Sequence, residues 1–374
     1  TYKPRVYSDG GDFIFQSEYR EAFENSNLIA DFSFNRDDEN SNTHLFAELD
    51  GEFDEKTSYE IKLQNVSNDN YLKIHSLGEN NLLIESESSL LSYLKIDRYI
   101  DEDTNFNATL KRYEDLSQRD SDRYQYIFPE FNFSKLIDIN PDYNGSFTFL
   151  SSGHQANYGT NIYEAQINND FNFNSYDFIS GSGLVTDYSL LLKNFNTYGK
   201  NSSTYDEKND HKIFGTALIK TELPLKKKLE KSTNYLKPII QARLSPTSGK
   251  DISSDSFTMD YNAIFSSNRI GRGDMVENGK SLTFGIEFEK QNLSNDKILS
   301  LNIGNVIKDK KNNNMPTRSK LDQTRSDIVG GVSYNLNNNL ELNYNFSYDR
   351  DLDHSNSDSL SANLSVNNLV TKFN

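Results

Sequence analysis

Apolar and polar residues alternate strictly over stretches of about ten residues along most of this chain. The segment 281–289, SLTFGIEFE, shows the pattern, and it recurs at 163–174, YEAQINNDFNFN, and at 340–349, LELNYNFSYD. Successive side chains of a strand point to opposite faces of a sheet. Each segment therefore predicts a β-strand with one apolar face and one densely polar face.

Roughly 16–18 segments of this kind follow one another, and each is about as long as a tilted strand that crosses a bilayer. The connections between them are rich in Asn, Asp, Ser and Gly, as around 312–314 and 335–341, which is typical of turns. The sequence therefore predicts an all-β fold, an antiparallel transmembrane β-barrel of the outer-membrane type. The alternative is a soluble β-sandwich, solenoid or adhesin-like sheet, but these have strands of about five or six residues or a fixed repeat period.

Composition narrows the classes of function. The low hydrophobic content of 35% is typical of disorder, yet 22 Tyr and 24 Phe in regular alternation argue against it. A formal charge of −16 argues against a nucleic-acid partner. The chain has no cysteine, its five histidines are far apart, and no nucleophile or phosphate-loop motif occurs. We expect no metal, no cofactor and no catalytic residues.

One short basic cluster, LKKKLEKS at 225–232, stands out from the acidic background. It is interpreted as a solvated turn or an interface anchor.

Four blocks of sequence contain residues that the alternating strand pattern does not explain. Their positions in this chain are Thr1, Pro4, Arg5, Tyr7, Asp9, Gly11 and Glu18–Arg20; then Pro129 and Glu130; then Glu222, Leu223, Leu225, Leu236, Pro238, Ser245 and Pro246; then Phe265, Ser266, Asn268, Arg269, Gly271, Asp274, Glu277 and Gly279. Together, and in this order, they resemble the barrel domain of the LptD family, the outer-membrane proteins that assemble lipopolysaccharide. The resemblance covers nearly the whole chain.

The resemblance implies a function and a set of partners. The protein is expected in the outer membrane of a Gram-negative bacterium, where it inserts lipopolysaccharide into the outer leaflet through a lateral gate and is not an enzyme. The family implies an LptE-like lipoprotein plug and an LptA-like periplasmic bridge as partners. Residues 1–374 are expected to form a single barrel domain. The N-terminal periplasmic jellyroll and the last barrel strands of the family are expected to be missing from these residues.

The sequence also departs from the family pattern. The usual Asp-Arg pair of the last block reads Asp274-Met275 here, and an arginine stands earlier, at Arg272. The cysteines that link barrel and periplasmic domain in some members are absent.

The resemblance gives three groups of candidate residues. The lateral-gate candidates are Pro4, Arg5 and Tyr7, since proline has no N–H for a strand ladder; a proline at a strand start is the alternative. The hairpin prolines are Pro238 and Pro246. The loop candidates are Asn268, Arg269, Gly271, Arg272, Asp274, Glu277 and Gly279, in a loop expected at the barrel mouth or in the lumen.

In that loop, Arg269 and Arg272 are expected to pair with carboxylates or to bind sugar phosphates. Gly271, Gly273 and Gly279 are expected to supply turns with positive φ. Two other functions remain open. A porin or substrate-specific channel needs a ring of charged residues, and a barrel hydrolase needs a serine, a histidine and a carboxylate brought together by folding.

Overall fold

A computed structural model describes residues 2–6, 13–36, 41–78, 83–138, 144–159, 161–247, 250–337, 340–366 and 369–373 of the 374-residue chain. The chain divides into two compact units. The first comprises Thr1–Ile137, Phe149–Asn169 and Phe195–Lys212, and the second comprises Asp138–Thr148, Asp170–Asn194 and Ile213–Asn374.

The described residues are almost entirely β-structure. Their 21 strands are β1 Tyr2–Val6, β2 Phe13–Ala22, β3 Ser26–Arg36, β4 Ser41–Asp54, β5 Thr57–Val66, β6 Ser89–Asp101, β7 Thr104–Asp115, β8 Tyr124–Asp138, β9 Gly145–Tyr158, β10 Ile162–Ser175, β11 Phe178–Ile179, β12 Val185–Lys200, β13 Asp210–Glu222, β14 Leu225–Lys228, β15 Thr233–Ser245, β16 Gly279–Gln291, β17 Lys297–Lys308, β18 Ile328–Asn337, β19 Leu340–Tyr348, β20 Ser355–Val366 and β21 Leu369–Phe373. The helical turns are α1 Tyr71–Ile74, η1 Asp120–Arg123 and η3 Ala263–Phe265.

Every strand except β1, β11, β14 and β21 spans nine residues or more. The remaining 17 strands confirm the expected 16–18 long segments. In the part of the chain that the structure describes, no helix is long and apolar enough to span a membrane.

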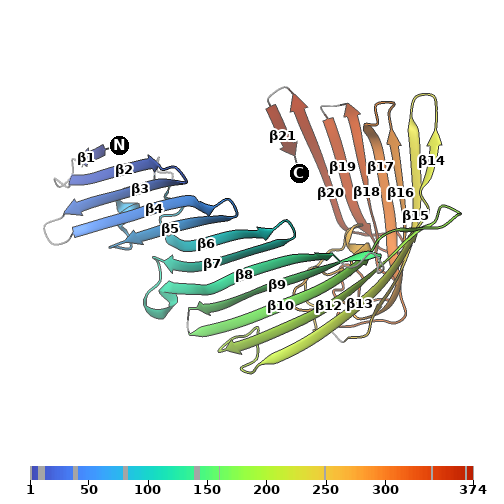
Figure 1. The fold of residues 1–374 in the computed structure, drawn as a ribbon, viewed down its shortest axis with the longest axis horizontal. Coiled ribbons are helices and arrows are strands. Elements are labelled where there is room, and N and C mark those ends of the chain that lie inside the picture. Colours follow the sequence, from blue (N-terminus) through green and yellow to red (C-terminus); the bar gives the residue numbers. More distant parts are fainter. Residues whose placement is uncertain are drawn as a thin grey trace. The chain divides into compact units, whose positions relative to one another are not determined.

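Strands that follow one another along the chain pair antiparallel in both units (Figure 1). In the first unit this holds from β1 to β8. In the second it holds from β15 to β21, with β13 and β14 both pairing with β15. This succession of hairpins is the up-and-down order expected of an outer-membrane barrel.

The resemblance implies a strand start at Pro129 and Glu130, but Pro129 lies inside β8. The pairing of β7 with β8 shifts register here, from Thr109 opposite Glu130 to Lys111 opposite Ile127. Proline cannot donate to a ladder and is tolerated in a strand at such an irregularity.

Burial along the strands is the reverse of that in a soluble protein. On β3, Phe32 is 41% exposed while Asp31, one residue before it, is 1% exposed. On β16, Phe284 is 37% exposed and Thr283 is 0% exposed. We call the face with Asp31 and Thr283 the polar face and the face with Phe32 and Phe284 the apolar face. An exposed apolar face opposite a covered polar face is what a strand that contacts lipid on one side requires.

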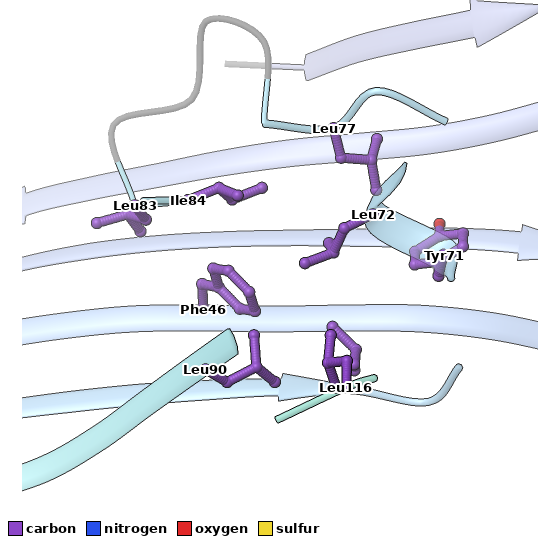
Figure 2. Packing of buried hydrophobic residues seen from close by; sticks show 9 residues of the cluster. Phe46, Tyr71, Leu72, Leu77, Leu83, Ile84, Leu90 and Leu116 are labelled. Carbon is purple, nitrogen blue, oxygen red and sulfur yellow. The ribbon is translucent and has the colours of Figure 1, made fainter. Parts of the chain in front are cut away.

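The main apolar cluster of the first unit lies on its polar face, beneath the connection from β5 to β6 (Figure 2). We call this connection the first loop, described at residues 67–78 and 83–88. Its apolar side chains pack around Phe46 of β4 and Leu90 of β6, and they are Tyr71, Leu72, Leu77, Leu83 and Ile84. Phe46 lies two residues from His44 on the same covered face of β4.

Candidate functional site

The connection from β15 to β16, described at residues 246–247 and 250–278, covers the polar face of the second unit; we call it the second loop. Its turn η3 lies against two glycines of the wall. A Cβ at Gly285 of β16 would lie 2.6 Å from the ring of Phe265, and one at Gly304 of β17 would lie 2.6 Å from Cδ1 of Ile264. Glycine at both positions lets the loop approach the strand backbones closely. The loop thus lies on the polar face of its unit; whether that is at the barrel mouth or in the lumen stays a prediction.

Arg269 is the centre of the second loop and is completely buried. Its guanidinium donates to the backbone oxygen of Ile264 at 3.0 Å, to Glu277 Oε2 at 3.1 Å and to Thr283 Oγ1 at 2.8 Å. Removing one partner of such a buried pair typically costs about 3–5 kcal/mol. Arg269 therefore joins two parts of the loop to the wall and is not exposed to a ligand.

Two cations from the strands complete this cluster. Arg243 of β15 donates to the backbone oxygens of Glu277 at 2.7 Å and Ser267 at 3.3 Å, and Lys308 Nζ of β17 lies 3.4 Å from Glu277 Oε1. Burial disfavours the charged form of Glu277, but the cations Arg269, Arg243 and Lys308 outweigh it and hold its pKa below the ordinary value. Glu277 is therefore a buried carboxylate that stays ionised.

Arg272 lies at the surface of the same loop. Its guanidinium makes a two-pronged contact with Asp274, at 2.7 and 2.8 Å, and a third bond to Asp255 Oδ2 at 2.6 Å. These hydrogen bonds from Arg272 hold the pKa of Asp274 below its ordinary value. Arg272 therefore pairs with Asp274 although it precedes Asp274 in this sequence. This confirms the expectation that Arg272 pairs with carboxylates.

A polar cavity of about 510 Å³ lies beside this pair. It is lined by Ser254, Asp255, Ser256, Phe257, Ile270 and Arg272. Hydroxyl, carboxylate and guanidinium groups next to one aromatic ring are suited to a ligand with many hydroxyls or a phosphate. A ligand can reach the second loop at this cavity.

The other residues predicted for the loop shape its backbone. Asn268 Nδ2 donates to the backbone oxygen of Arg272 at 2.7 Å. Gly271 and Gly279 have φ of +70° and +104°, which confirms the expectation of left-handed turns. Gly273 does not have such a φ, so the expectation for it was wrong.

The sequence did not identify Arg243, Thr283 and Lys308 as members of the cluster. Their signal was present but weak: each lies at a polar-face position of its strand, between apolar-face neighbours such as Leu282 and Phe284. Alternation places them on a face, but it does not show which loop covers that face.

The two hairpin prolines stand where a backbone N–H is not needed. Pro238 lies in β15, opposite the break between β13 and β14, and its carbonyl accepts from the N–H of Leu223 at 3.1 Å. In an antiparallel strand the N–H and C=O of one residue point to the same side, so no bond to β16 is lost. Pro246 directly follows the last residue of β15.

The gate candidates lie at the first strand. Pro4 of β1 stands opposite Phe15 of β2, and Arg5 stands opposite Ile14. Tyr7 lies outside the described residues. The structure thus places two of the three candidates in the first strand, and their role in gating stays a prediction.

A serine, a histidine and a carboxylate do meet on the polar face of the first unit. His44 Nε2 lies 2.6 Å from Asp31 Oδ1, and His44 Nδ1 lies 2.5 Å from Ser33 Oγ. All three are at most 2% exposed, and the hydroxyl of Tyr71 from the first loop lies 2.8 Å from Ser33 Oγ. In serine hydrolases the serine contacts Nε2 and is open to substrate. This network therefore joins two strands and a loop and gives a hydrolase no support.

Among the described residues no group of His, Cys, Asp and Glu is arranged to hold a metal ion.

Residues 41–374 match the family model described as LptD, LPS transport system D. This chain belongs to the LptD family. LptD-family proteins form a transport family and not an enzyme family. The chain is therefore an LPS-transport protein of the outer-membrane barrel type, located in the Gram-negative outer membrane.

No match was found among curated proteins. Solved structures similar to this LptD-family chain include a "Bacterial polysaccharide outer membrane secretin" (7% identity, TM-score 0.27, 79% of this chain and 82% of that one). The copper transporter OprC is similar at 11% identity, with a TM-score of 0.32, over 97% of this chain and 64% of that one. The alcaligin outer membrane receptor FauA from Bordetella pertussis is similar at 8% identity, with a TM-score of 0.31, over 100% and 72%. These scores are too low to support any inference.

Proposed function

We propose that this LptD-family chain passes lipopolysaccharide into the outer leaflet of the outer membrane through a lateral gate beside β1. The observation that carries the proposal is the reversed burial of both units in a chain of this family. Polar residues line one face and apolar residues the other, so the saccharide of a lipid has polar groups to follow while its acyl chains stay next to lipid.

The weak point of the gate is assigned to the first strand. β1 pairs with β2 over only five residues, and one of them is Pro4. Each backbone hydrogen bond is worth about 0.5–1.5 kcal/mol net, and more where water cannot replace it. A first strand with a missing donor is easier to separate from a neighbour than a regular one.

The polar cavity at Arg272 is proposed to contact the saccharide. Arg272 and Asp255 lie at its surface, and Ser254 and Ser256 add hydroxyls. Arg269 is assigned a structural part because it is buried, while the half-exposed Arg272 is assigned the contact with sugar or phosphate.

We further propose that residues 1–374 act as one barrel domain of a longer protein, with an LptE-like lipoprotein inside and an LptA-like bridge that delivers lipopolysaccharide. A barrel with many strands has a lumen wider than its own side chains fill, which supports an internal partner. A photo-crosslinker at Glu341 or Asn343 should capture a lipoprotein in cells. A barrel that is stable alone and captures none would contradict this.

The gate is tested with Pro4→Ala in the full-length protein. An added N–H should tighten pairing of the first strand, so surface lipopolysaccharide should fall while the heat-modifiable folded barrel stays normal. Pro129→Ala is the matched control, since Pro129 lies in β8 and not in the first strand. Normal delivery by a folded Pro4→Ala barrel would show that Pro4 only begins a strand.

A further inference from the structure

The apolar face of the second unit contains a groove where the strands carry small residues. Two adjoining cavities, of about 540 and 700 Å³, share Ala217 of β13 and Leu244 of β15 in their lining. Phe147, Phe171 and Phe173 border the first cavity, and Leu282 and Ile307 border the second. The first cavity is almost wholly apolar, the second is mostly so, and both lie on the apolar face of the strands.

The floor of the groove is open because Gly215 of β13 has no side chain. Around a Cβ built at Gly215, no atom apart from its chain neighbours lies within 4 Å. Small residues on β13 between the larger ones of the neighbouring strands leave a depression where ordinary barrel wall would be convex. The space above Gly215 is open to a linear apolar chain.

One end of the groove is basic, although the whole chain carries a charge of −16. Lys280 and Asp309 belong to the lining, and Lys310 and Lys311 directly follow Asp309. Lys280, Lys310 and Lys311 are exposed, and within the described ranges they form no ion pair. Exposed lysines without an ion pair favour an anionic headgroup.

This basic end lies where the long connections are. Residues 246–278 join β15 to β16 and residues 309–327 join β17 to β18, whereas only 292–296 join β16 to β17 at the opposite end of the strands. Long loops are extracellular and short turns periplasmic in outer-membrane barrels. The lysines are therefore at the level of the outer-leaflet headgroups.

We infer that this groove is a docking site for lipopolysaccharide on the lipid-facing wall, with acyl chains over Gly215 and Ala217 and a phosphate near Lys280, Lys310 and Lys311. The site is on the apolar face of the second unit, not on the polar face that the second loop covers. The inference rests on the proposed function only for the orientation of the strands and for lipopolysaccharide as the outer-leaflet lipid.

The test uses full-length protein in cells, with a photo-crosslinking residue at Leu244. The matched control is the same residue at Phe34, which is exposed on the apolar face two residues before the end of β3. Adducts are identified as lipopolysaccharide or phospholipid. We expect lipopolysaccharide adducts at Leu244 to exceed those at Phe34 severalfold.

Two variants are then examined with the Leu244 crosslinker. Lys280→Glu/Lys310→Glu/Lys311→Glu reverses the charge of the basic end, and Gly215→Leu fills the floor. Each should lower lipopolysaccharide adducts at Leu244, by about tenfold for the charge reversal, while adducts at Phe34 and the heat-modifiable barrel stay unchanged.

Equal adducts at Leu244 and Phe34, adducts mainly to phospholipid, or adducts unaffected by both variants would overturn the inference. Surface lipopolysaccharide is measured in the same strains. If delivery does not respond to Pro4→Ala while the Leu244 adducts behave as expected, the gate proposal fails and the docking site stands. If lipopolysaccharide delivery falls in Pro4→Ala but the Leu244 adducts do not change in the two groove variants, the docking site fails and the gate proposal stands.

Discussion

The two loops that cover the polar faces both bury apolar side chains, such as Leu72 in the first and Ile264 in the second, and they differ in that a buried ion cluster also holds the second. The first loop is fixed by apolar side chains, Leu72 and Leu77 among them, gathered around Phe46 (Figure 2). The second loop, beyond its apolar packing, is fixed by a buried carboxylate, Glu277, among the three cations Arg269, Arg243 and Lys308. Apolar packing is roughly proportional to area and not directional, whereas a buried ion cluster is stable only in one geometry.

This difference predicts different behaviour. The second loop should adopt one position and should tolerate substitutions in its ion cluster poorly, because the loss of one charge leaves the partner charges buried and unpaired. The first loop should lose stability in proportion to the volume removed. A loop that carries the candidate ligand cavity needs a fixed geometry, and the ion cluster supplies it next to Arg272.

The largest effect is expected for Glu277→Gln. Arg269, Arg243 and Lys308 would then lie buried without a carboxylate, so the second loop should detach at a cost of about 3–5 kcal/mol. Limited proteolysis of the loop and the heat-modifiable barrel measure this. Asp255→Asn, which changes a half-exposed carboxylate of the same loop, is the control. A Glu277→Gln loop as resistant as the unchanged one would contradict the central part given to the cluster.

The next effect is expected for Leu72→Ala in the first loop. Removing a fully buried leucine leaves a cavity and typically costs about 2–5 kcal/mol. Protease cleavage should increase in the first loop and not in the second. Ile74→Ala in the same short helix is the control, since Ile74 is exposed. Equal cleavage in both variants would show that the apolar cluster does not hold this loop.

A smaller effect is expected for Gly285→Ala. The new Cβ would lie 2.6 Å from the ring of Phe265, and such overpacking costs about 1–3 kcal/mol. Gly215→Ala, which meets open space, should leave the barrel unchanged. Thermal unfolding followed by heat modifiability compares the two. If both variants behave alike, the second loop does not rest on Gly285.

The smallest effect concerns pH and the pair of Arg272 with Asp274. The pKa of Asp274 is lowered in the folded protein. The pair therefore adds stability above the ordinary carboxyl pKa, and this stability is lost as the pH falls through the lowered folded value. Because the pair is partly exposed, its contribution is about 1 kcal/mol at most. Loop proteolysis by an acid-stable protease should rise on acidification in the unchanged protein. Asp274→Asn should be more sensitive already at neutral pH and should change less on acidification; an identical profile would show that the pair contributes nothing.

Alternation alone predicted much of the fold. In 281–289 it assigned Leu282, Phe284 and Ile286 to one face and Ser281 and Thr283 to the other, and burial confirms both. This succeeds because the side-chain period of a strand is a local property of the backbone. The local pattern also contained Gly271 and Gly279, where the turn itself demands positive φ.

The contacts across the polar faces were decided only by the tertiary structure. Arg243 meets the backbone of Glu277 34 residues away, and Gln16 and His44 meet at Asp31 from two different strands. The sequence left Arg269 and Arg272 as equal candidates for a ligand, and folding buried the first and left the second half-exposed. A period of two tells which side of a strand a residue takes, but which loop returns to cover that side depends on side chains far apart in the chain that pack only once the sheet has formed.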